Sequence, residues 1–66
     1  MNLEQLLEYM RIHIISLDQD QQKLQAEMDM LDPASKDYGT LEFQFNLISG
    51  EIAGISYMLG VAEGKI

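Results

Sequence analysis

The chain has 66 residues, with eleven acidic and four basic side chains, a net charge of -7, no cysteine and one histidine. This composition excludes disulfide bonds and supplies a structural metal site poorly. The negative charge repels the phosphates of nucleic acids and anionic lipids, so we expect neither as a direct ligand. A chain this short rarely gains more than roughly 3 to 5 kcal/mol from its own core. We therefore expect self-association to complete that core.

Residues 3–31 carry apolar side chains at alternating steps of four and three, which predicts a helix with one coiled-coil seam. The seam consists of Leu3, Leu7, Met10, Ile14, Leu17, Gln21, Leu24, Met28 and Leu31. Asn2 can cap the start of this helix, with Gln5 completing a capping box. For Gln21, the polar member of the seam, two interpretations stay open: its amide fixes the register or oligomeric state, or it reaches water.

Residues 32–35 are predicted to form a turn, because Pro33 disfavours a helical Asp32 and Ser35 can cap a second helix. That helix is expected over residues 36–62, with fraying from Glu63 to the end of the chain. Its seam consists of Tyr38, Leu41, Phe45, Ile48, Ile52, Ile55, Leu59 and Ala62. The pattern predicts one all-α domain over residues 1–66, an antiparallel helical hairpin.

The two seams also predict how the helices are aligned. Paired positions in an antiparallel hairpin keep a constant sum, and pairs such as Leu17 with Ile52 and Ile14 with Ile55 sum to 69. A sum of 66, which places Gln21 opposite Phe45, fits almost as well because the repeat is regular. The register is therefore predicted to within one layer.

A second apolar stripe on helix two predicts an interface between copies of the chain. Gly50 and Gly54 lie at its middle, where missing side chains let another helix approach, although they could also simply loosen the helix. Apolar residues outside the seam in the first half of helix one, Ile15 among them, are predicted to join this interface. The predicted oligomer contacts are Leu6, Tyr9, Ile12, Phe43, Leu47, Gly50, Gly54, Tyr57 and Val61. A dimer that forms a four-helix bundle is the expected assembly.

The turn end of the hairpin is predicted to be acidic. Residues 18–42 hold seven acids and two bases, a net charge of -5, which leaves -2 for the rest of the chain. We call residues 18–42 the acidic arm. Two interpretations are open: the arm keeps the assembly soluble, or it binds a basic partner. The candidate partner-binding residues are Asp18, Asp20, Glu27, Asp29, Asp32 and Asp37.

The sequence shows no pattern of residues for catalysis or for a metal site. His13 has no carboxylate or second histidine three or four positions away, so it is expected to flank the seam as a partly buried residue. Residues 18–29 match part of a calcium loop, but Lys23 replaces its glycine and Asp29 its bidentate glutamate. No serine-histidine-acid trio or phosphate-binding loop is present. We expect no enzyme activity, no cofactor and no metal.

These features predict a non-catalytic, homo-oligomeric structural or protein-interaction module with an unidentified protein partner. The alternative is an acidic nucleic-acid mimic that inhibits a DNA-binding or defence enzyme. Its acids, about seven over ~40 Å, are sparse beside duplex DNA, with one charge per ~1.7 Å.

The expected location follows from composition and from the apolar runs. A short, cysteine-free, acidic, glutamine-rich hairpin resembles small proteins of phages and bacterial mobile elements in composition and helix pattern. Uninterrupted apolar runs of two or three residues predict no membrane span. The chain is therefore expected in the cytoplasm of its host, or in a virion if a phage encodes it.

Overall fold

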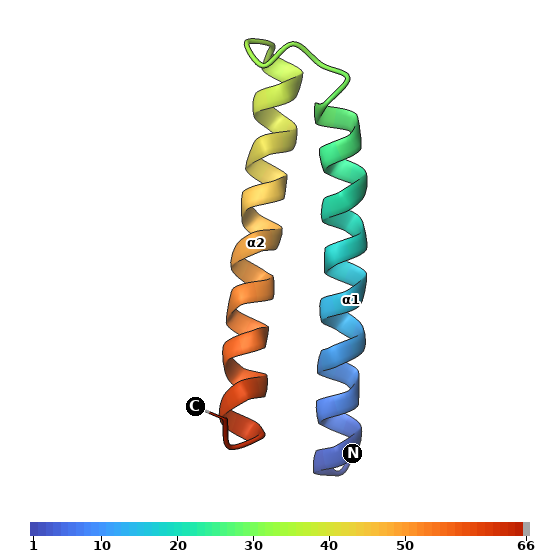
Figure 1. Cartoon of the computed structure of the whole chain (residues 1–66), viewed down its shortest axis with the longest axis vertical. Helices are drawn as coiled ribbons and strands as arrows, with labels where there is room; N and C mark the ends of the chain where they lie inside the picture. The colour runs from blue at the N-terminus through green and yellow to red at the C-terminus, as the bar shows by residue number, and fades with distance from the viewer. Residues whose placement is uncertain (66) are drawn as a thin grey trace.

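The computed structural model describes residues 1–65 and folds them into two antiparallel helices, α1 (Leu3–Met28) and α2 (Lys36–Ala62). Figure 1 shows the hairpin, with both termini at one end and the turn at the other. The molecule measures 45 × 18 × 16 Å, and its radius of gyration of 14.9 Å exceeds the value of about 11 Å for a compact domain of this length. The prediction of an all-α hairpin is confirmed for the described residues.

Both helices begin at the predicted caps. At the start of α1, the Asn2 side chain accepts a hydrogen bond from the Gln5 amide at 2.8 Å, and the Gln5 side chain accepts one from the Asn2 amide at 3.1 Å. At the start of α2, the Ser35 hydroxyl accepts a hydrogen bond from the Tyr38 amide at 3.1 Å. These bonds satisfy amide groups that have no partner within a helix, and they fix where each helix starts.

The end of α1 differs from the prediction, because the helix stops at Met28 and the turn covers residues 29–35. The amide of Met30 donates to the carbonyl of Glu27, and that of Leu31 to the carbonyl of Met28, which tightens the chain out of the α-helix. Leu31 nevertheless stays half-buried. The heptad pattern predicted the burial of Leu31 correctly, but the prediction that Leu31 is helical was wrong.

The end of α2 also differs from the prediction, because a defined cap follows Ala62 where fraying was expected. Gly64 adopts a φ of 74°, in the left-handed region that glycine tolerates. The Lys65 amide donates to the Gly60 carbonyl at 2.9 Å, and the Gly64 amide to the Val61 carbonyl at 3.1 Å. This pair of bonds is a Schellman motif, which closes the helix end. Ile66 lies outside the described residues.

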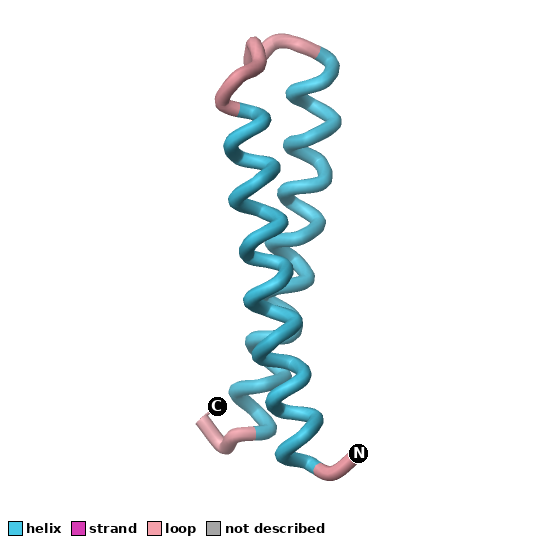
Figure 2. The backbone as a smooth tube through the Cα atoms, turned by 90° about the vertical axis from the view of Figure 1, so that its right-hand side faces the viewer, coloured by secondary structure: helices cyan, strands magenta, loops and turns pink. Residues whose placement is uncertain are grey.

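The core of the hairpin is the pair of predicted seams. Leu17 and Met28 are the buried hydrophobic side chains of the described residues, with 7% and 4% of their surface exposed. The other seam residues are half-buried, except Leu3 and Ala62, which are exposed at the open end of the hairpin. Figure 2 shows the helices crossing at a shallow angle, so the seams stay together along their length. Two helices alone leave this core only half covered.

Gln21 fixes the alignment of the two helices. Its side-chain amide donates to the Phe45 carbonyl at 3.0 Å and to the Ser49 hydroxyl. A helical carbonyl points toward the residue four positions on, so the Phe45 oxygen points toward Ser49 and both acceptors lie near Ile48, the residue that a sum of 69 pairs with Gln21. The hydrogen bonds therefore favour that register and support the interpretation of Gln21 as a register-setting residue.

Candidate interaction surface

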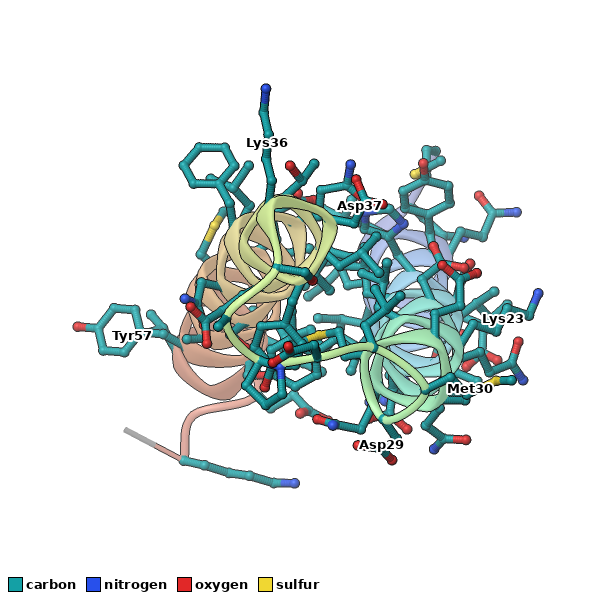
Figure 3. All side chains as sticks on the ribbon, turned by 90° about the horizontal axis from the view of Figure 1, so that it is seen from above. Lys23, Asp29, Met30, Lys36, Asp37 and Tyr57 are labelled. Atoms are coloured by element: carbon teal, nitrogen blue, oxygen red, sulfur yellow. The ribbon has the colours of Figure 1, made fainter. Side chains whose placement is uncertain are left out.

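The second apolar stripe of α2 lies almost directly opposite its seam. At 100° per residue its members fall within about 80° of one another and roughly 170° from the seam. We call this stripe the outer face of α2; it consists of Phe43, Leu47, Gly50, Gly54, Tyr57 and Val61. In Figure 3, which looks along the hairpin, Tyr57 points away from α1. The exposed fractions are 65% for Phe43, 53% for Leu47, 60% for Tyr57 and 48% for Val61.

Gly50 and Gly54, at the middle of the outer face, have no role in the fold of a single chain. A Cβ atom added at either position would meet nothing within 4 Å. Neither glycine adopts a positive φ, and α2 runs through both without a break. Each costs about 1 kcal/mol in helix stability relative to alanine. Neither backbone conformation nor packing within the chain explains why these positions lack side chains.

The apolar residues outside the α1 seam are exposed too, but they do not form one face. Leu6, Tyr9, Ile12 and Ile15 have exposed fractions of 44%, 60%, 57% and 58%. Because each follows the last by three residues, they step around the helix by about 60° at a time. One neighbouring helix could not cover all four. These residues therefore do not share one side of α1, and a common interface of Leu6, Tyr9 and Ile12 with the outer face of α2 stays a prediction.

His13 lies where the sequence predicts, half-buried beside the seam. Its ring stacks on that of Tyr9, with ring centroids 6.1 Å apart and planes 12° apart. Stacking on an aromatic ring accounts for the position of His13 without a metal. Residues 1–65 contain no group of three or more metal-binding side chains placed to hold an ion.

The acids of the arm are all exposed, but they do not line up. On α1 and its C-terminal cap, Asp18 and Asp29 lie on one side of the helix, and Asp20 and Glu27 lie almost opposite, by the rotation of 100° per residue. Asp18 and Asp29 accept hydrogen bonds from glutamines one turn away, at 3.0 Å and 2.8 Å. A partner that approaches from one direction therefore meets two of these four carboxylates.

The remaining two candidate acids have roles in the turn. The Asp32 carboxylate accepts a hydrogen bond from the Ala34 amide at 2.9 Å, which holds the chain in a tight turn before α2. Asp37 lies in the first turn of α2, where a negative charge stabilises the positive end of the helix dipole. Local structure is therefore sufficient to explain both residues.

The ion pairs found in residues 1–65 all lie at the terminal end of the hairpin. Arg11 of α1 pairs with Glu63, which follows α2, and also with Glu8 at 3.5 Å, while Lys65 pairs with Glu63 at 3.8 Å. The hydrogen bond from Arg11 lowers the pKa of Glu63, and the same bond raises the pKa of Arg11. The sequence analysis missed this cross-helix pair, although Arg11 and Glu63 follow the seam residues Met10 and Ala62.

Two depressions lie on the described surface. One is lined by Glu4, Gln5, Leu7, Glu8 and Arg11 near the termini. A second is lined by Asp18, Gln21, Gln22, Gln25 and Phe45 at the middle of the hairpin. Both are open to solvent, whereas small-molecule sites are concave and bury most of their ligand.

One helix, α2, is long and apolar enough to cross a membrane, judged by length and composition alone. The prediction of no membrane span was based on the length of uninterrupted apolar runs. The hydropathy averaged over α2 is higher than those short runs suggest. Glu51 lies near the middle of this helix, where a charge is costly in a bilayer. A location away from membranes stays a prediction.

The chain matches no family model, and no curated protein or solved structure matches it either.

Proposed function

We propose that this chain is a non-catalytic assembly module, in which two hairpins associate and present their acidic arms to a protein partner. The observation that carries the proposal is the outer face of α2, an exposed apolar stripe with two glycines that the single chain does not require. Exposed apolar patches of several hundred Å² on a soluble protein mark interaction sites.

The thin core of the hairpin supports association. Leu17 and Met28 are the buried hydrophobic residues among those described, and burial of apolar surface is worth about 25 cal/mol per Å². A chain of this size has no other internal means of stabilisation, since it lacks cysteine. A second hairpin on the outer face would bury apolar surface that the first leaves in water.

The acidic arm supports a basic protein partner. Its net charge of -5 is not compensated by an ion pair within the described chain, since the pairs formed lie at the terminal end. Uncompensated charge speeds the encounter with an oppositely charged surface. The nucleic-acid mimic has less support, because the α1 acids divide between two opposite sides of the helix and do not follow one line of phosphates.

Light scattering tests the proposed association. We expect the wild-type chain to give twice the monomer mass of 7.5 kDa at micromolar concentration. Gly54→Leu, which fills the middle of the outer face, should return the mass to that of a monomer. Gly39→Leu is the matched control: it lies on the same side of α2 and its Cβ also meets nothing within 4 Å, but it lies one turn before Phe43, beyond the end of the stripe, so the dimer should persist. A monomeric wild-type chain would overturn the proposal.

The role of the arm is tested separately, by affinity capture from a host lysate. A bait with Asp18→Asn, Asp20→Asn, Glu27→Gln and Asp29→Asn keeps Asp32 and Asp37, which serve the turn. It should lose a basic protein that the wild-type bait retains at low salt and releases at high salt. Equal capture by both baits would show that the arm is only a solvated surface.

A further inference from the structure

The outer face of α2 is symmetric about its own middle. Its members form three pairs whose position numbers sum to 104: Phe43 with Val61, Leu47 with Tyr57, and Gly50 with Gly54. In a two-fold dimer each residue contacts a partner that makes the same contact in return. An alternation of four and three always gives a constant sum, as the inner seam does with 100; what distinguishes the outer face is that both glycines fall at its centre and the larger side chains at its ends. A parallel pair would also bring glycine to glycine, but it would place two acidic arms, each with a net charge of -5, side by side, whereas an antiparallel pair keeps them apart. The larger side chains then meet at the ends of the contact and the glycines meet at its centre.

The place of the stripe on α2 determines the order of the four helices. Because the outer face lies nearly opposite the seam, and Tyr57 points away from α1 in Figure 3, a helix docked there touches α2 and not α1. The two α2 helices then form the middle of the assembly, and each is covered by its own α1 on the far side. This layered order differs from a square bundle, in which every helix has two neighbours.

The elongated hairpin exposes more surface, over both helices together, than a compact monomer of its mass. The chain exposes 4917 Å², whereas a compact monomer of 7.5 kDa exposes about 4,250 Å² by the usual scaling of surface with mass. The excess is about 700 Å² per chain. If a dimer covers this excess on both copies, it buries about 1,400 Å² in total, within the range of specific interfaces.

We infer that the occupant of the outer face is a second copy of this chain, docked antiparallel so that paired positions on the two α2 helices sum to 104. The inference rests on the proposed function and deepens it by giving the orientation of the dimer. Gly50 of one copy lies against Gly54 of the other, where the absence of Cβ atoms lets the helices approach closely. The two acidic arms then lie at opposite ends of the assembly.

Cross-linking of introduced thiols tests this register, and the chain has no cysteine of its own to interfere. We expect an equimolar mixture of Leu47→Cys and Tyr57→Cys chains to form a disulfide heterodimer under mild oxidation, because facing Cα atoms in a tight helix pair can come within disulfide range. Each variant alone should cross-link at least tenfold less. Ala53→Cys lies beside the two-fold axis and should cross-link to itself, whereas Gln19→Cys, on the outside of α1, should not.

The possible outcomes distinguish the antiparallel register inferred here from dimerisation itself. Efficient self-linking of Leu47→Cys together with self-linking of Tyr57→Cys would show a parallel dimer and overturn the inference while association stands. A dimer by mass without any of these links would place the interface elsewhere. A monomer that binds vesicles of phosphatidylcholine through the same face would overturn both, because a bilayer would then be the occupant.

Discussion

The two apolar faces of α2 differ in what covers them. The inner face packs on α1, and its residues from Tyr38 to Leu59 are half-buried along the seam. The outer face carries side chains of similar size, yet they remain between 48% and 65% exposed. The difference shows that one chain supplies a partner for one face only. We predict that the two faces contribute to different steps: the inner face to folding of the chain, and the outer face to association of two chains.

A charge placed on each face should give the largest contrast. Ile52→Asp introduces a carboxylate into the seam at a cost of about 3 kcal/mol, comparable with the whole stability of such a chain, so we expect helical circular dichroism to collapse. Leu47→Asp is the matched change on the outer face and should leave the helical signal of the monomer while abolishing the dimer. Equal loss of helix in both variants would show that folding and association are one step.

Alanine at both central glycines should stabilise the folded monomer and weaken the dimer. In the double variant Gly50→Ala, Gly54→Ala, each new Cβ has free space within the chain, so the monomer should gain about 1 kcal/mol per site. The dimer should weaken at least tenfold, because the methyl groups hold the α2 helices apart. Urea unfolding at two protein concentrations measures both effects, and Gly39→Ala should raise stability without weakening the dimer.

Removal of the charge at Glu51 should have a smaller effect, in favour of the dimer. In the inferred register Glu51 flanks the outer face and lies near Glu51 of the second copy, and two like charges near a two-fold axis repel. Glu51→Gln should therefore tighten the dimer a few-fold, most clearly at low salt. Glu42→Gln, which removes the same charge farther from the axis, is the control for net charge. Equal tightening by both variants would contradict the register.

The smallest effect should come from the ion pair at the terminal end. The pKa of Glu63 is lowered in the folded chain by its hydrogen bond from Arg11. The stabilisation from this pair is therefore complete above the ordinary glutamate pKa, and it fades as pH falls through the lowered value of the folded state. The difference in unfolding free energy between the wild type and Arg11→Gln should be small at pH 7 and vanish in acid. A difference that grows in acid would contradict this assignment.

The sequence was sufficient for the hairpin because helix position, caps and seam all follow from local patterns. Asn2, Ser35 and Pro33 mark the boundaries through their own chemistry, and the seam residues repeat at a helical spacing. The sequence was not sufficient to predict how α1 and α2 end. Leu31 has the spacing of a helical seam residue but the backbone of a turn, and the cap at Gly64 depends on hydrogen bonds that no apolar pattern records.

One part of the candidate site could likewise be predicted from the sequence, and another part could not. The outer face of α2 could be predicted because its residues share one side of a single helix. The α1 residues Leu6, Tyr9 and Ile12 were predicted to join the same interface from their apolar character alone, and because they lie on different sides of α1 that prediction rests on less than the one for α2. The pair of Arg11 and Glu63 lies between two helices, so it depends on the alignment that Gln21 fixes.

The distance between spin labels on Glu42→Cys in the two copies tests the central claim most directly. Glu42 is exposed and lies to the side of the outer face, so a label there leaves the contact undisturbed. In the antiparallel dimer the two labelled positions are separated by 20 residues along the paired helices, about 30 Å at 1.5 Å per residue. We expect a pulsed electron resonance distance near that value. A distance below about 20 Å would indicate parallel α2 helices, and the absence of any dipolar signal at micromolar concentration would show that the chain does not dimerise.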